Sequence, residues 1–258
     1  MTDTLGEFKF DLVITLYNEE ANVEALVVDI EHEWARDLGG ALAQVIVVNN
    51  GSTDGTAALL QRLAAARPWL KVVEQHPTRF YGGGLYEGCR HSRAPYVALM
   101  PGDLQVPAAA LRTVWTALVA RSAPRPQRPL FVKGFRQSRY DGFTGVLVSR
   151  TFTKLTNFIL GLSVRDVNGL PKVFDRKLLD LLPNERMVSF TLDAQLLSVA
   201  ATHGWTVDEV PVAFLRRKRG ASSWSNARLR TYARTVRQLI RLRGLRGAPP
   251  VPMTLAHD

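Results

Sequence analysis

The first half of the chain alternates short apolar runs with stretches of helical periodicity, and this alternation constrains the fold more than any other feature. Apolar runs rich in β-branched residues cover 10–17, 43–50, 70–75 and 96–100. Apolar residues recur at the spacing of one helix face after the first, second and fourth of these runs. Strands that are apolar on both faces and alternate with helices predict an α/β fold with a doubly wound, mostly parallel sheet.

A proline-rich break at 122–129 precedes a less regular second half. We expect this half to continue the same domain, so that one α/β domain covers 1–224 and a basic helix and tail cover 225–258. The elements that we expect here are strands at 130–135, near 170–174 and at 206–215, and helices around 146–161 and 191–203.

The positive charge of the chain is concentrated near its C-terminus. The net charge is +10, and the segment 216–246 holds eleven Lys or Arg residues and no acid, so the rest is close to neutral. Within it, 226–244 has the pattern of an amphipathic helix that ends at Gly244. Such a helix fits an anionic membrane surface, and a helix packed on the body with its arginines in water fits nearly as well. We do not expect nucleic-acid binding, because the basic residues do not surround an aromatic-lined groove. The expected apolar face consists of Leu229, Tyr232, Ala233, Val236, Leu239 and Ile240, and the basic face of Arg230, Arg234, Arg237 and Arg241.

The cysteine content and the N-terminal sequence bear on where the protein is expected to be located. The single cysteine, Cys89, excludes an internal disulfide. The N-terminus has no basic-then-apolar signal pattern, and no apolar run approaches the roughly 20 residues that span a bilayer. We therefore expect a cytoplasmic protein that is not integral to a membrane.

Polar residues follow three of the predicted strands where each strand ends. They lie at 17–19, 49–52 and 102–105. Ligands of such sheets bind at the carboxyl ends of the strands, so these groups are expected to converge. Asp103 and Gln105 offer carboxylate and amide oxygens, which hard divalent cations prefer. The alternative is an ordinary turn with a helix-entry glutamine, and the convergence of three strand ends favours a metal site.

Six segments, taken in order, resemble the inverting family 2 glycosyltransferases of the GT-A fold. The similarity is strongest to the dolichyl- or polyprenyl-phosphate glycosyltransferases and covers nearly all of 10–224. The chain has Thr15 where the family usually has proline, Asn49 and Asn50 where acids are common, Pro101 in place of the first Asp of the metal motif, and Ser223 in place of lysine. The segments are "VITLYNEEANV", "VVNNGSTDGT", "PGDLQVP", "VKGFRQSRYDG", "RDVNGLPKVFDR" and the closing run ending "EVPVAFLRRKRGASSW".

The resemblance implies a nucleotide-diphosphate sugar donor, Mg²⁺ or Mn²⁺, and a polyprenyl phosphate acceptor. By the family pattern, Asp103 and Gln105 hold the metal, and Arg136 and Arg150 serve the donor diphosphate and the acceptor phosphate. Asp193 falls where a base or an orienting carboxylate is expected, and an Asp that only stabilises a helix start is equally compatible. The implied nucleotide-sugar residues are Thr15, Tyr17, Glu19, Asn49, Gly51, Arg217 and Ser222.

Further expectations concern partners and alternatives. The glycine-rich stretch 81–92 is expected to be a loop, either approaching phosphate or ordinary. We expect peripheral association with the cytoplasmic face of a membrane, with a separate membrane protein as a further partner. A second hypothesis has a sugar hydroxyl as acceptor, for which Asp193 is indispensable as base. A third, based on the departures from the family pattern, is a non-catalytic subunit that binds a nucleotide sugar.

Overall fold

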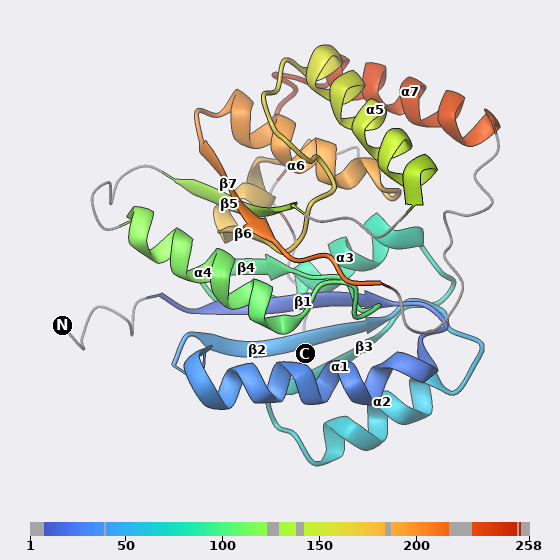
Figure 1. Cartoon of the computed structure of the whole chain (residues 1–258), viewed down its shortest axis with the longest axis vertical. Coiled ribbons are helices and arrows are strands. Elements are labelled where there is room, and N and C mark those ends of the chain that lie inside the picture. The colour runs from blue at the N-terminus through green and yellow to red at the C-terminus, as the bar shows by residue number, and fades with distance from the viewer. Residues whose placement is uncertain are drawn as a thin grey trace.

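The computed structural model describes residues 8–38, 40–122, 129–137, 142–183, 187–216, 229–251 and 253. Its centre is a seven-stranded sheet with the order β3-β2-β1-β4-β6-β5-β7 (Figure 1). Only β6 is antiparallel to its neighbours among these strands. The expected mostly parallel α/β sheet is confirmed. The strands are β1 (Phe10–Leu16), β2 (Leu42–Asn49), β3 (Leu70–Glu74), β4 (Tyr96–Leu99), β5 (Leu130–Arg136), β6 (Lys172–Asp175) and β7 (Thr206–Val212).

Helices cover both faces of the sheet (Figure 1). One apolar cluster joins one sheet face to α1, α2 and α4, and a second joins the opposite face to α3, α5, α6 and α7. The sheet is therefore doubly wound, as expected. The helices are α1 (Glu20–Glu33), α2 (Thr56–Ala65), α3 (Phe80–Arg90), α4 (Ala108–Ser122), α5 (Gly142–Leu160), α6 (Thr191–Thr202) and α7 (Leu229–Gly244), with short η1 (Trp34–Leu38) after α1 and η2 (Arg176–Leu181) after β6.

The glycine-rich stretch is the clearest departure from expectation, because most of it forms α3 and not a loop. Its glycines allow close contact with the sheet. A Cβ on Gly88 would overlap the side chain of Val13 and lie 3.0 Å from that of Val48. A Cβ on Gly84 would overlap the Thr15 hydroxyl. The close approach that we assigned to a loop near phosphate is thus made by a helix on strands β1 and β2.

The C-terminal helix α7 packs on the body of the protein. Leu239 and Leu242 are buried in the cluster that α5 and α6 also line. Ile240 was expected on the apolar face and is instead 59% exposed, because Leu242 takes the inward position. The helix ends at Gly244 as expected. No helix among the described residues is long and apolar enough to cross a membrane.

Candidate active site

The loops that follow β1 and β2 are bonded to each other. The Asn18 backbone N–H donates to Ser52 Oγ at 3.0 Å, and the Thr53 N–H donates to Asn18 Oδ1 at 2.8 Å. The Glu19 N–H donates to Thr56 Oγ1 at 3.0 Å. Tyr17 is 51% exposed beside these contacts. Two of the three predicted polar groups therefore form one continuous rim.

Asn49 and Asn50 connect this rim to the start of α3. Both side chains are almost completely buried. Asn49 donates to Glu74 Oε2 at 2.7 Å and accepts from the Ser52 N–H at 3.3 Å. Asn50 donates to the Phe80 carbonyl at 2.7 Å and accepts from the Arg79 N–H at 3.0 Å. In this conformation both buried side-chain amides hold the loops around the site in place through these hydrogen bonds.

Two other predicted residues of the rim have little free space around them. Gly51 has φ +78°, and a Cβ there would lie 2.9 Å from the Thr78 backbone nitrogen. The Thr15 hydroxyl is buried and has no hydrogen-bond partner within the described part of the chain. Both residues lie where β1 and β2 meet α3, at the predicted edge.

The turn after β4 brings Asp103 to the same edge. A Cβ on Gly102 would overlap the Leu16 side chain and lie 3.2 Å from Ile14 Cγ2, so glycine lets this turn pass over the end of β1. Asp103 Oδ1 accepts from the Gln105 N–H at 3.1 Å. The Gln105 side-chain amide donates to the Leu215 carbonyl, just after β7, at 3.3 Å.

Asp103 and Asp193 both act electrostatically on one tyrosine that the sequence did not single out. Asp193 is in the first turn of α6 and is 1% exposed. Burial, with the charges of Asp193 and Asp103, raises the pKa of Tyr81 well above its ordinary value. The Tyr81 ring stacks on Phe190, with centroids 5.2 Å apart. The charges of both predicted carboxylates therefore act on the start of α3.

Arg136 is held by a carboxylate of the protein. Its Nε and one terminal nitrogen donate to Asp166 at 2.7 and 2.8 Å, and that nitrogen also donates to Ser149 Oγ at 2.9 Å. The guanidinium lies over the Phe214 ring at 5.2 Å. Arg150, one residue after Ser149 on α5, is exposed. Arg217 and Ser222, predicted to close over the donor, lie outside the described residues.

Two lysines missed by the sequence analysis lie beneath this edge. Lys133 on β5 pairs in register with Lys172 on β6, and both are 0% exposed. Lys172 Nζ lies 2.8 Å from Asp193 Oδ1, and Lys133 Nζ lies 3.2 Å from Glu209 Oε1. A lysine inside an apolar strand pattern is the signal that would have identified them, because a buried ammonium requires a partner.

The side chains at this edge can hold a hard cation only if a substrate supplies further oxygen ligands. Among the described residues no group of three or more His, Cys, Asp or Glu side chains could hold a metal ion. Asp103 supplies one carboxylate, and Pro101 supplies no side-chain ligand. Mg²⁺ is commonly held by one or two carboxylates together with substrate phosphates and water. Asp103 fits that pattern.

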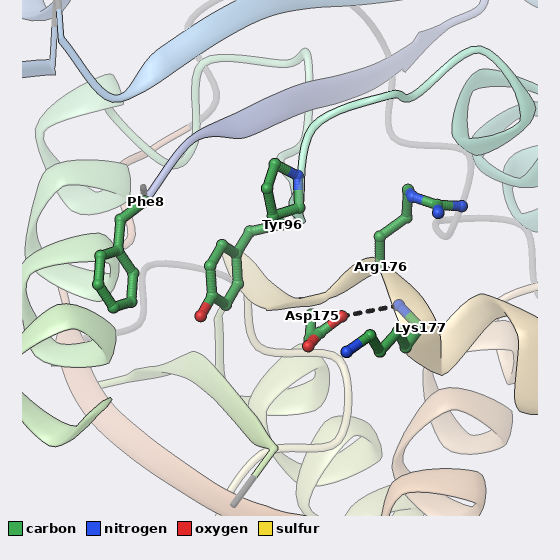
Figure 2. Close-up of a pocket in the computed structure, with 6 residues that line it drawn as sticks. Phe8, Tyr96, Asp175, Arg176 and Lys177 are labelled. Carbon is green, nitrogen blue, oxygen red and sulfur yellow. Dashed lines mark hydrogen bonds between the residues drawn. The ribbon is translucent and has the colours of Figure 1, made fainter. Parts of the chain in front are cut away.

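A separate pocket lies at the opposite edge of the sheet, where β4 begins and β6 ends (Figure 2). Its volume is about 270 Å³, and Phe8, Tyr96, Asp175, Arg176 and Lys177 are among its lining residues. The Asp175 carboxylate accepts from the Lys177 N–H at 2.9 Å, as Figure 2 shows. This pocket holds none of the predicted site residues.

Comparison with known proteins gives consistent matches. The family model described as Glycosyl transferase family 2 matches residues 11–182, more than half of the chain. The polyprenol monophosphomannose synthase of Mycolicibacterium smegmatis is 25% identical over 227 residues, covering 85% of this chain and 82% of that protein. The dolichyl-phosphate beta-glucosyltransferase ALG5C of Trichomonas vaginalis is 25% identical over 178 residues, covering 66% of this chain and 52% of that protein.

Solved structures share the fold. Glucosyl-3-phosphoglycerate synthase from Mycobacterium tuberculosis, crystallised with Mn²⁺, uridine diphosphate and phosphoglyceric acid, superposes with a TM-score of 0.64 at 20% identity. The match covers 94% of this chain and 80% of that one. The GT-A-like α/β architecture expected from the sequence is thereby confirmed.

Proposed function

The chain belongs to glycosyl transferase family 2, and on that basis we propose that it transfers a hexose from a nucleotide-diphosphate sugar to a polyprenyl phosphate, with inversion. The observation that carries this proposal is the common edge of β1, β2 and β4, where Gly102 lets the turn with Asp103 pass over the end of β1 and where the charges of Asp103 and Asp193 both act on Tyr81. Two relatives, one named a polyprenol monophosphomannose synthase and the other a dolichyl-phosphate beta-glucosyltransferase, support the choice of acceptor.

The donor occupies the rim formed by the loops after β1 and β2. Thr15, Tyr17, Glu19, Asn49 and Gly51 lie there and shape the nucleotide site. Asp103, with Gln105 beside it, would hold Mg²⁺ or Mn²⁺. When bound, the cation neutralises charge on the leaving diphosphate. Arg217 and Ser222 complete the donor site on the proposed closing segment.

The acceptor attacks from the side of α5 and α6. Arg150 is exposed on α5 and free to meet a phosphate, whereas Arg136 is oriented by Asp166. A phosphate acceptor is already anionic near neutral pH, so the protein need only align it and compensate its charge. Asp193 then serves as an orienting carboxylate.

The lipid acceptor requires the protein to reach a membrane surface, and the adjacent helices α5 and α7 offer a suitable face. Leu147 and Phe158 on α5 are 55% and 83% exposed, and Ile240 on α7 is 59% exposed. Arg234 and Arg237 on α7 are also exposed. We propose peripheral binding to an anionic, cytoplasmic membrane face, together with a membrane-protein partner.

Flotation with anionic liposomes at low salt tests this surface. Arg237→Glu should weaken binding about fivefold or more, since each basic residue near such a surface contributes about 1 kcal/mol. Arg62→Glu is the matched control, because Arg62 is an exposed arginine on α2, across the sheet. Equal flotation of the two variants, or no binding by the wild type, would contradict membrane association.

A sugar hydroxyl is the second candidate acceptor, favoured by Asp193 in the first turn of α6, whose charge acts on Tyr81 together with that of Asp103. A hydroxyl acceptor needs a base, so Asp193→Ala should then abolish transfer. With a phosphate acceptor the same substitution should be milder.

One panel experiment decides among these functions. GDP-, UDP- and dTDP-hexoses are incubated with Mn²⁺ or Mg²⁺ and with polyprenyl phosphate, a sugar acceptor or 3-phosphoglycerate, and product masses are measured. We expect a hexosyl-phosphate lipid with one donor base. Transfer only to a non-lipid acceptor would reject the lipid assignment. The absence of both transfer and donor hydrolysis, with donor binding retained, would indicate a non-catalytic binding subunit.

A further inference from the structure

The sheet buries two lysines side by side directly behind the candidate site. Lys133 and Lys172 are register partners on β5 and β6 and are 0% exposed. They lie on the sheet face of Phe131 and Phe174, whose rings stack 5.2 Å apart. Burying an ammonium group is costly unless an acid or several carbonyl groups meet it. Each lysine therefore needs a specific reason to be there.

The two lysines have different partners. Lys133 donates to the Gly134 carbonyl at 3.1 Å, to the Asp166 carbonyl, and to Glu209 Oε1 at 3.2 Å. These contacts connect β5 to β7 and to the loop before β6, so Lys133 stabilises this part of the sheet. Lys172 instead forms an ion pair with Asp193, across from β6 to the first turn of α6.

The surroundings of the Lys172–Asp193 pair are charged but balanced. Lys172 is faced by Asp193 and Asp166 and by the cations Arg136 and Lys133. Burial lowers the pKa of Lys172, and Asp193 opposes that shift. The charge of Asp193, with that of Asp103, also acts on Tyr81 at the start of α3. Both side chains of the pair are buried, and Phe190, just before α6, stacks on Tyr81, so the Asp193 end of the pair lies near the start of α3.

We propose that Lys172 is a positioning residue for the transfer step, fixing the Asp193 carboxylate through Oδ1 and with it the first turn of α6 beside the site. The proposal rests on the transferase function proposed above. Lys172 itself touches no substrate, because it is completely buried. Without it, Asp193 would stay in the site with an unpaired and movable carboxylate, and productive alignment of the acceptor would be rarer.

Kinetics of two matched variants test this role. Lys172→Met and Lys133→Met each replace one buried, register-paired lysine by an apolar side chain of similar length. Lys172→Met should lower kcat about tenfold or more, at temperatures well below its melting point, with KM for the donor unchanged. Lys133→Met should keep kcat within about threefold of the wild type. If the two variants lose kcat equally, or if only stability changes, the positioning role is refuted.

A titration that needs no activity separates this proposal from the proposed function. Lysine side-chain signals are followed by NMR against pH in the wild type and in Asp193→Asn. The pKa of Lys172 should fall further in Asp193→Asn, because burial is then unopposed by a carboxylate, while the Lys133 signal should move less. An unchanged Lys172 titration would overturn the pairing. If no donor gives transfer but the Lys172 shift is found, the function fails and the ion pair stands.

The kinetic comparison remains decisive if Lys172→Met does not fold. Lys172→Gln then replaces it in the kinetic comparison, since it removes the charge and keeps a hydrogen-bond donor. Full wild-type kcat in that variant would refute the positioning role.

Discussion

The buried Lys133 makes the stability of the protein depend on pH in a specific way. Burial, together with the nearby charge of Lys172, lowers the pKa of Lys133 from an ordinary 10.5 to about 8, against the opposing effect of Glu209 and Asp166. Between these two values the folded protein has released a proton that the unfolded chain still binds. The free energy of unfolding therefore rises with pH in this window, by about 1.4 kcal/mol per unit and about 3 kcal/mol in all.

Replacing the lysine removes this dependence. Urea unfolding, followed by tryptophan fluorescence at pH 7, 8, 9 and 10, is compared for the wild type, Lys133→Met and Lys154→Met. Relative to Lys133→Met, the wild type should gain about 2 kcal/mol between pH 8 and pH 10. Lys154→Met, which changes an exposed lysine on α5, should follow the wild type. A constant difference between wild type and Lys133→Met across this range would refute the reasoning.

Three further predictions concern the site and the core. Asp103→Ala should abolish metal-dependent transfer, and the wild type should need more than low-micromolar metal because Asp103 is the one carboxylate at this position; tight activation would contradict this. Gly88→Ala should destabilise the protein by about 1–3 kcal/mol, because its Cβ would overlap Val13. Gly244→Ala, with nothing within 4 Å, should leave the urea midpoint nearly unchanged, and equal midpoints for both variants would count against the packing of α3. Burial and then the charge of Asp11 raise the pKa of the Cys89 thiol to about 12, so native protein should not react with a thiol reagent at pH 8; rapid labelling would show that α3 is open.

The sequence predicted the sheet well because strand and helix periodicities are local signals. All seven strands fall within a few residues of the expected ranges, and the edge that collects Tyr17, Asn49 and Asp103 follows from parallel order alone. The α3 helix was missed because glycine is a poor helix former. Most of its glycines are explained by residues far away in the chain: Gly88 lies against Val13, Gly84 against Thr15, and Gly82 against the Met187 and Ser189 carbonyls.

The charged layer beneath the site was also not predictable from local patterns. Lys133 and Lys172 stand in different strands, and nothing in either strand names Glu209 or Asp193 as the partner. These ion pairs depend on the position of β6, which lies between β4 and β5 and is antiparallel to both. The orientation of Arg136 by Asp166 has the same origin, because it joins β5 to the loop before β6.

The most direct test of the central claim is the mass of the lipid made by wild type and by Asp103→Ala. Each protein is given polyprenyl phosphate, Mn²⁺ and the nucleotide sugars in turn. The account predicts that the wild type converts the lipid to a product one hexose heavier and that Asp103→Ala, folded to the same extent, leaves it unchanged. An unchanged lipid with every donor, or equal conversion by the variant, would contradict it.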